Sequence, residues 1–374
     1  MKKERNINLD VIRCFAIVLV ICLHFFFNGG YYKQIMHGEK LMLMATMRTF
    51  TSNCIPLFLM LTGYLMADKK VTLRSYPARA AKIFIPYVLI TVFMIVVSKV
   101  WLQTSLTKLD FWAALRNILV YEQYSWYVSM YLGLLLLIPF LNKWWSALSS
   151  KKEETLFIAV LLVIGTLPSL LNYFDLTFAH GWKTLLLSED YTTLMPGWWE
   201  SGTSLYPLTY FFIGAYIKKH FQPGSIRKRY LLLVLALCVP LFGLHNFYRS
   251  YGKTFVWGRW TAYGAYQCVI MSIPLFLLLL SIRFERLPAL CKSAIARMSS
   301  LAYGTFIASW IVDKFVYSWV KTNTSYLPDR YWIAVPIVLA VFAGSMFISL
   351  AADLLYKGIV YLWNRARRGK NLPA

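Results

Sequence analysis

Apolar runs of about twenty residues recur along the whole chain, and each is long enough to cross the roughly 30 Å hydrocarbon core of a bilayer as a helix. Only 15% of the 374 residues are charged, whereas 59% are hydrophobic. A soluble protein of this length would need far more surface charge. The sequence therefore predicts an all-α polytopic membrane protein. About ten transmembrane helices are expected, at residues 7–27, 46–66, 80–100, 125–144, 155–172, 204–219, 230–247, 263–283, 299–320 and 332–357.

Basic residues are distributed unevenly among the connectors between these spans. Most of the 39 Lys and Arg residues fall in the N-terminus, the C-terminal tail and four short connectors that alternate with longer, less basic loops. The positive-inside rule then places both termini in the cytoplasm. The net charge of +23 is mostly this topological signal, so no nucleic-acid partner is expected.

The first span carries Arg13 near one end and His24 near the other, eleven residues later. Eleven helical residues turn through about 1100°, so the two side chains share one face and are separated by about 16 Å along the axis. Asp10 precedes Arg13 by three residues and is close enough to pair with it. Ionisable groups at membrane depth usually face a protein-lined or watery cavity. The stripe thus predicts a cavity along this helix, although Arg13 could instead snorkel to the headgroups and His24 could be interfacial.

The segment from Asn8 to His24 resembles the opening helix of the acyltransferase 3 family of integral membrane acyltransferases, in which a basic residue, ten intervening residues and a His recur. Further segments resemble later parts of that family in the same order: IPLFLMLTGYLM (55–66), YPARAAKIFIPY (76–87), YSWYVSMYLGLLLLIPFL (124–141), YPLTYFFIGAYI (206–217) and MSSLAYGTFIASWI (298–311).

The chain departs from the family pattern at a few positions. Ser309 stands where the family's late segment usually ends in His, and Phe306 replaces the usual Tyr. Tyr124 and Ser125 precede Trp126, where many relatives carry a His before the Trp. These departures bear on the subgroup and the acceptor more than on His24.

The resemblance implies transfer of an acyl group, usually acetyl, from cytoplasmic acetyl-CoA to a hydroxyl of a cell-surface glycan or its lipid-linked precursor. Arg13, Arg79 and Lys82 would bind the phosphates of acyl-CoA, since guanidinium and ammonium groups pair with phosphate oxygens. His24 would act as general base or as a nucleophile that forms an acyl-imidazole, with the base role favoured. Asp10 would orient Arg13. No Cys/His cluster has metal-site spacing, so no metal is expected.

The acceptor site is expected on the outer side, where aromatic residues are frequent, although a membrane aromatic belt explains the same enrichment. The candidate residues are Glu122, Tyr124, Trp126, Trp199 and Glu200, and segments 109–124 and 167–204 are candidate acceptor surfaces. Asp313 is expected to pair with its neighbour Lys314 near the outer interface. Asp353 and Lys357 have the spacing of an ordinary helical ion pair, and Arg48 is expected at the outer interface.

A single acyltransferase 3-like membrane domain at 1–362, followed by a short basic cytoplasmic tail at 363–374, is the simplest organisation. The expected location is the bacterial cytoplasmic membrane, with membrane lipid, acyl-CoA and a surface polysaccharide or lipid-linked glycan as partners. The alternative is a transporter or flippase of a lipid-linked sugar or small metabolite, because ten spans, interior prolines and a buried cation suit that class too.

Overall fold

The computed structural model describes residues 5–69, 76–100, 126–172, 205–324 and 327–369, and leaves undescribed the side chains of 76–79, 82, 98–100, 359 and 362–369. Within these ranges the chain is helical apart from short turns and one isolated bridge, and no strand occurs. The all-α prediction is confirmed. The α-helices are α1 (Ile7–Gly29), α2 (Gly38–Thr51), α3 (Cys54–Met66), α4 (Tyr76–Val100), α6 (Trp126–Ala147), α7 (Lys151–Gly165), α8 (Pro168–Leu171), α11 (Tyr206–His220), α12 (Lys228–Arg249), α13 (Tyr266–Ser281), α14 (Ala289–Asn323), α15 (Leu327–Trp332) and α16 (Ala334–Gly369).

Seven helical segments of the described chain are long and apolar enough to cross a membrane: Ile7–Lys33, Gly38–Met66, Trp126–Ala147, Lys151–Leu171, Lys228–Arg249, Arg259–Arg286 and Ala334–Gly358. The three other predicted spans coincide with α4, α11 and α14. The chain is thus a helical membrane protein. The count of ten crossings and the side of each terminus stay predictions.

The predicted span 46–66 is broken into α2 and α3. Pro56 has no N–H and cannot bond to the carbonyl of residue 52, which favours a new helix start here. The hydroxyls of Thr51 and Ser52 both donate to the carbonyl of Arg48, and Asn53 Nδ2 donates to the carbonyl of Phe50. Such side-chain bonds compete with the helical ladder and end α2 at Thr51.

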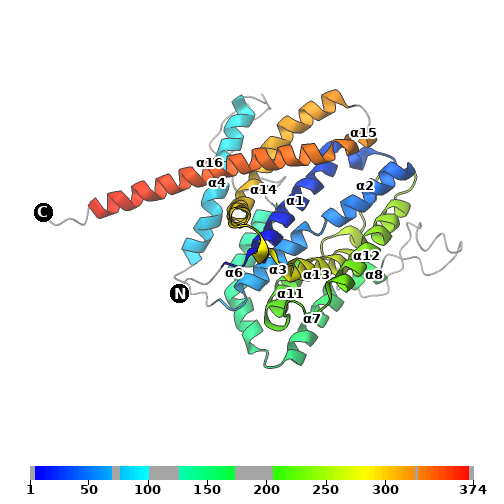
Figure 1. Ribbon diagram of the computed structural model, residues 1–374, viewed down its shortest axis with the longest axis horizontal. Helices are drawn as coiled ribbons and strands as arrows, with labels where there is room; N and C mark the ends of the chain where they lie inside the picture. The colour runs from blue at the N-terminus through cyan, green and yellow to red at the C-terminus, as the bar shows by residue number, and fades with distance from the viewer. Residues whose placement is uncertain (1–4, 70–75, 101–125, 173–204, 325–326, 370–374) are drawn as a thin grey trace.

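Helix α1 lies inside the bundle and contacts α14, α3, α16, α13 and α2. Figure 1 shows α16 crossing the bundle and extending beyond it toward the C-terminus. Asp10, near the start of α1, contacts Ser299 of α14, and His24, near its end, lies beside Ser309. The two helices therefore run in the same direction, which keeps one face of α14 against the polar stripe of α1.

Two asparagines fix the start of α1. The side chain of Asn6 caps the helix by accepting from the N–H of Asn8. Asn8, buried at 2% exposure, donates from Nδ2 to the carbonyls of Leu279, Leu280 and Ile282 at 2.9, 3.0 and 2.6 Å. These carbonyls belong to the end of α13, where a helix leaves acceptors unsatisfied. Asn8 thereby ties the start of α1 to α13.

Candidate active site

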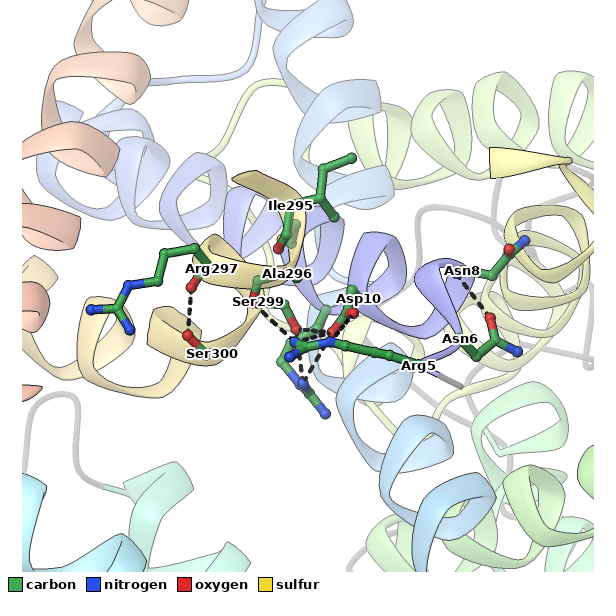
Figure 2. Close-up of polar contacts among 11 residues, drawn as sticks. Arg5, Asn6, Asn8, Asp10, Ile295, Ala296, Arg297, Ser299 and Ser300 are labelled. Atoms are coloured by element: carbon green, nitrogen blue, oxygen red, sulfur yellow. Dashed lines mark hydrogen bonds and ion pairs between the residues drawn. The ribbon is translucent and has the colours of Figure 1, made fainter. Parts of the chain in front are cut away.

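Asp10 is the centre of a polar network at the start of α1 (Figure 2). Its buried carboxylate accepts hydrogen bonds from Arg5 Nε at 2.5 Å and from Ser299 Oγ at 2.6 Å. The same hydroxyl accepts from Arg13 Nη1 at 2.8 Å, so Ser299 bridges the carboxylate and the guanidinium. Asp10 Oδ1 itself lies 3.8 Å from Arg13 Nη1. The hydrogen bond to Asp10 raises the pKa of the Arg5 guanidinium above its ordinary value.

Arg13 lines a cavity of about 630 Å³, a size typical of small-molecule sites. We call it the Arg13 cavity. Its wall also includes Thr62, Lys69, Tyr131 and Tyr303. Asp353 lies at the same cavity, where it accepts from Lys357 at 2.8 Å and from Arg297 at 3.1 Å. The predicted helical pair of Asp353 and Lys357 is confirmed.

His24 lines a second cavity of about 540 Å³, the His24 cavity, in which aromatic side chains predominate. Trp126 stacks on Tyr263 with ring centroids 5.7 Å apart, and Phe27 stacks on Trp257 at 5.8 Å. The wall is made by Val20, Leu23, His24, Phe27, Asn28, Cys54, Ile55, Trp126, Trp257, Tyr263, Phe306, Trp310 and Lys314. Trp126 was predicted on the acceptor side and lies at this cavity.

The two cavities adjoin each other. Val20, Ile55 and Phe306 line both, so these three side chains form a common wall. The Phe306 ring lies 6.4 Å from the His24 ring and 5.6 Å from the Tyr127 ring, between the two spaces. The sequence predicted one cavity along α1. The structure instead has two, with one polar residue of the stripe at each.

Asp313 lies beside His24 instead of pairing with Lys314 as predicted. It is 1% exposed, and its Oδ2 is 3.6 Å from His24 Nδ1. Consecutive helical residues do not face each other, so Lys314 points elsewhere, over the Trp310 ring at 5.3 Å. The expected pair of Asp313 with Lys314 is wrong. The usable signal was the spacing of four residues from Ser309, which places both on one face of α14.

Ser309 and Asn28 also lie at His24. Ser309 Oγ lies 3.5 Å from His24 Nδ1. Asn28 Nδ2 donates to Asp313 Oδ2 at 3.2 Å and to the backbone carbonyl of His24 at 3.0 Å. The Nδ1 side of the imidazole therefore faces a hydroxyl and a carboxylate that an amide fixes in place.

Arg48, which was expected at the outer interface, is buried among aromatic rings. This side chain is 4% exposed, with its guanidinium carbon 4.8 Å from the Phe255 ring centroid and 4.7 Å from that of Trp257. Its Nε donates to the Tyr32 hydroxyl at 3.1 Å. Stacking on aromatic faces offsets the removal of the guanidinium from water, so Arg48 supports the aromatic wall of the His24 cavity from behind.

Several predicted site residues lie outside the described part of the chain: Glu122, Tyr124, Trp199 and Glu200, together with segment 109–124 and most of 167–204. Arg79 and Lys82 fall on the backbone of α4, but their side chains are outside the description. Sequence reasoning missed Arg5, Ser299 and Asn28, whose contacts join segments that are remote in the chain or were not examined as partners.

Comparison with known protein families gives a match over residues 6–354 to the acyltransferase 3 model, described as an acyltransferase domain. The chain belongs to the acyltransferase 3 family. No curated protein and no solved structure matches it. As a member of the acyltransferase 3 family with several helices able to cross a membrane, it is a membrane acyltransferase.

Proposed function

We propose that this acyltransferase 3 protein moves an acyl group, most simply acetyl, from cytoplasmic acyl-CoA to a hydroxyl of a cell-surface or lipid-linked carbohydrate. The proposed setting is the bacterial cytoplasmic membrane. One observation carries the proposal: Arg13 and His24 line two adjoining cavities of small-molecule size that share a wall. A membrane-crossing transfer needs a donor site and an acceptor site that meet at the reacting atoms.

The Arg13 cavity is the proposed donor site. CoA carries phosphates at one end and a thioester at the end of a flexible arm, so it needs cations at a cavity mouth and a reactive group deeper in. Arg13 and Lys69 supply positive charge at this cavity, and Arg79 and Lys82 of α4 are proposed to add to it. Guanidinium groups match phosphate oxygens well. The bridge through Ser299 and Asp10 would hold Arg13 in the orientation that binds.

His24 is the proposed reactive group. As a general base, it takes the proton of the acceptor hydroxyl while the oxygen attacks the thioester carbonyl; the C–S bond breaks, and the CoA thiolate recovers a proton from the imidazolium. As a nucleophile, it first forms an acyl-imidazole and releases the thiol, after which the hydroxyl attacks the acyl group. Both routes give the ester and free CoA.

The His24 cavity is the proposed acceptor site. Sugar rings present apolar C–H faces that stack on aromatic side chains, and Trp126, Trp257 and Tyr263 line this cavity. Aromatic residues also gather at membrane interfaces without any ligand. The stacked arrangement of Trp126 on Tyr263 around the cavity that holds His24 favours the ligand role.

The experiment is O-acetyl analysis of surface carbohydrate from cells that carry the protein or its His24→Ala variant. Loss of acyl transfer is expected with expression and folding retained, since His24 is assigned to chemistry. His37→Ala is the matched control, because His37 is exposed and lines neither cavity. Continued acetylation by the His24 variant, at the level of the control, would defeat the assignment.

Transport without chemistry is the competing function. A flippase would move a lipid-linked sugar without consuming acyl-CoA, whereas the proposed enzyme releases one CoA thiol for each acyl group transferred. Thiol release by purified protein in detergent therefore separates the two functions. Arg13→Ala should chiefly raise the KM for acyl-CoA, and an unchanged affinity would remove Arg13 from the donor site.

A further inference from the structure

We propose that Asp313 is a positioning residue for His24: it sets which ring nitrogen works on the acceptor and balances the charge that the ring gains during transfer. This inference rests on the proposed function. It names a role for a carboxylate that neither the motif of the first helix nor the family match assigns.

The geometry around the imidazole supports this role. Asp313 Oδ2 lies 3.6 Å from His24 Nδ1, and Asn28 Nδ2 donates to that same oxygen at 3.2 Å. Asn28 also donates to the backbone carbonyl of His24. One amide thus fixes the carboxylate relative to the helix turn that carries the imidazole. His24 itself lines the aromatic cavity, whereas Asp313 lines neither cavity, so the carboxylate contacts the imidazole from outside the proposed acceptor site.

The burial of Asp313 argues against a purely incidental position. A carboxylate at 1% exposure on a helix within a membrane bundle is costly, and such groups usually pair and serve a function. His24 is the titratable residue within ion-pair distance of the Asp313 carboxylate. A distance of 3.6 Å is too long for a hydrogen bond, yet catalytic contacts are often long before substrate binds. Protonation of the imidazole adds a full charge and strengthens the attraction in this low-dielectric site.

The proton inventory follows from that contact. With Nδ1 facing Asp313, the ring keeps its proton on Nδ1 and receives the hydroxyl proton on Nε2. The imidazolium then faces a carboxylate, and Nε2 later returns its proton to the thiolate. Overall, one proton passes from the acceptor hydroxyl to the CoA thiolate, and His24 ends with the number of protons it began with. Asp313 stays ionised throughout.

The sequence departs from the family pattern at the place where this contact is made. Position 309 is Ser, and its hydroxyl lies 3.5 Å from His24 Nδ1. Asp313 follows one turn later on the same face of α14. A small side chain at 309 leaves that side of the ring accessible to the carboxylate. In this chain a carboxylate at position 313 therefore reaches the same ring nitrogen as the Ser309 hydroxyl.

The test is Asp313→Asn in purified protein, with kcat, the KM for acyl-CoA and the pH dependence of kcat as readouts. A fall in kcat of about 100-fold or more is expected, since a misplaced or wrong tautomer removes most of the base catalysis. The KM should stay within about twofold because Asp313 lines neither cavity. The acid limb of the profile should move to lower pH, since loss of a nearby negative charge makes His24 easier to deprotonate.

Other titratable groups near His24 set the controls for the pH profile. The His24 cavity is also lined by Cys54 from the start of α3, Tyr263 from the segment before α13 and Lys314 from α14. Lys314→Gln removes a cation and should move the acid limb in the opposite direction, to higher pH. Asp329→Asn on α15, exposed and lining neither cavity, should change neither kcat nor the profile.

A second variant keeps the proposal testable if Asp313→Asn does not fold. Asp313→Leu removes the buried charge and replaces it by an apolar side chain of similar size, a change that buried ionic sites often tolerate. It should show the same loss of kcat and the same shift. A folded variant of either kind with wild-type kcat and an unmoved acid limb would overturn the proposal.

Combining Asp313→Asn with His24→Ala tests the positioning role of Asp313 separately from the proposed function. If Asp313 acts through His24, adding Asp313→Asn to His24→Ala should cause no further loss. A further loss as large as that of the single variant would show that Asp313 acts on the substrate directly, and would overturn the positioning role. Full activity of His24→Ala would instead overturn the proposed function. Loss in that variant beside full activity of folded Asp313→Asn would overturn this inference alone.

Discussion

The hydroxyl of Ser299 joins two residues of α1 that do not meet closely by themselves. It accepts from Arg13 Nη1 and donates to Asp10 Oδ1, whereas the two charged groups lie 3.8 Å apart. Ser299→Ala should therefore loosen Arg13 without removing its charge. Loss of about 1 kcal/mol of hydrogen bonding corresponds to roughly a fivefold rise in the KM for acyl-CoA. Steady-state kinetics in detergent would measure it, with kcat nearly unchanged.

Ser225→Ala is the control for that experiment, because Ser225 is exposed in the turn between α11 and α12. It should leave both constants unchanged. An unaltered KM in the Ser299 variant, or a fall in kcat with no change in KM, would contradict the orienting role of the bridge. The second outcome would place Ser299 in the chemical step.

At the same scale, the sequence identified those site residues whose relation is local. Asp10, Arg13 and His24 share one helix, and helical geometry is enough to relate them. Arg5 and Ser299 also bond to Asp10, but Arg5 precedes the first helix and Ser299 belongs to a helix remote in sequence. Helical periodicity cannot relate residues of separate segments, so these contacts could not be predicted from it. Asp313 was assigned to its chain neighbour although helical neighbours diverge by about 100°. Its spacing from Ser309 was the better guide.

Among the helices, α3 and α11 approach each other most closely at two glycines. An ideal Cβ at Gly63 would lie 1.8 Å from the carbonyl oxygen of Phe211, and one at Gly214 would lie 2.0 Å from that of Met60. Small residues allow this backbone contact in membrane bundles. Gly63→Ala should push the helices apart at a cost of about 3 kcal/mol, seen as a lower unfolding temperature in detergent.

Gly133→Ala is the matched control, since a Cβ at this exposed position of α6 meets nothing within 4 Å. Its unfolding temperature should be unchanged or higher, because alanine favours helix over glycine by about 1 kcal/mol. Equal stability of the Gly63 and Gly133 variants would contradict the close crossing. Because Ile55 and Thr62 of α3 line the cavities, loss of the crossing should also reduce activity.

The elements themselves were largely predictable because apolar length alone indicates a membrane helix. Helices occur at all ten predicted positions within the described chain. The length of the apolar run could not show the helix break inside 46–66. Pro56 and the run Thr51, Ser52 and Asn53 were sequence signals for this break. Length also could not show that the space along α1 is divided, because Phe306 enters it from a helix remote in sequence.

For the whole molecule, the direction of each helix decides which cavity meets the cytoplasm. Helices α1 and α14 run in the same direction, with Asp10 against Ser299 and His24 beside Ser309. In a ten-span path whose helices alternate in direction, the first and ninth spans must run in the same direction, as α1 and α14 do. The Arg13 cavity lies at the end of the bundle where α1 begins, and the basic connectors predict that this end faces the cytoplasm.

Thiol labelling tests that orientation directly. Cys291 is exposed just after the start of α14, five residues before the Ala296–Ser300 turn that meets the start of α1. In a variant that retains Cys291 as its sole cysteine, a membrane-impermeant maleimide should label inside-out vesicles but not right-side-out ones. Ile35→Cys in a cysteine-free background should give the reverse, because the exposed Ile35 follows the far end of α1. Labelling of Cys291 from outside would show that the Arg13 cavity faces away from the cell interior, where acyl-CoA is made. Both the predicted topology and the assignment of this cavity as the donor site would then be wrong.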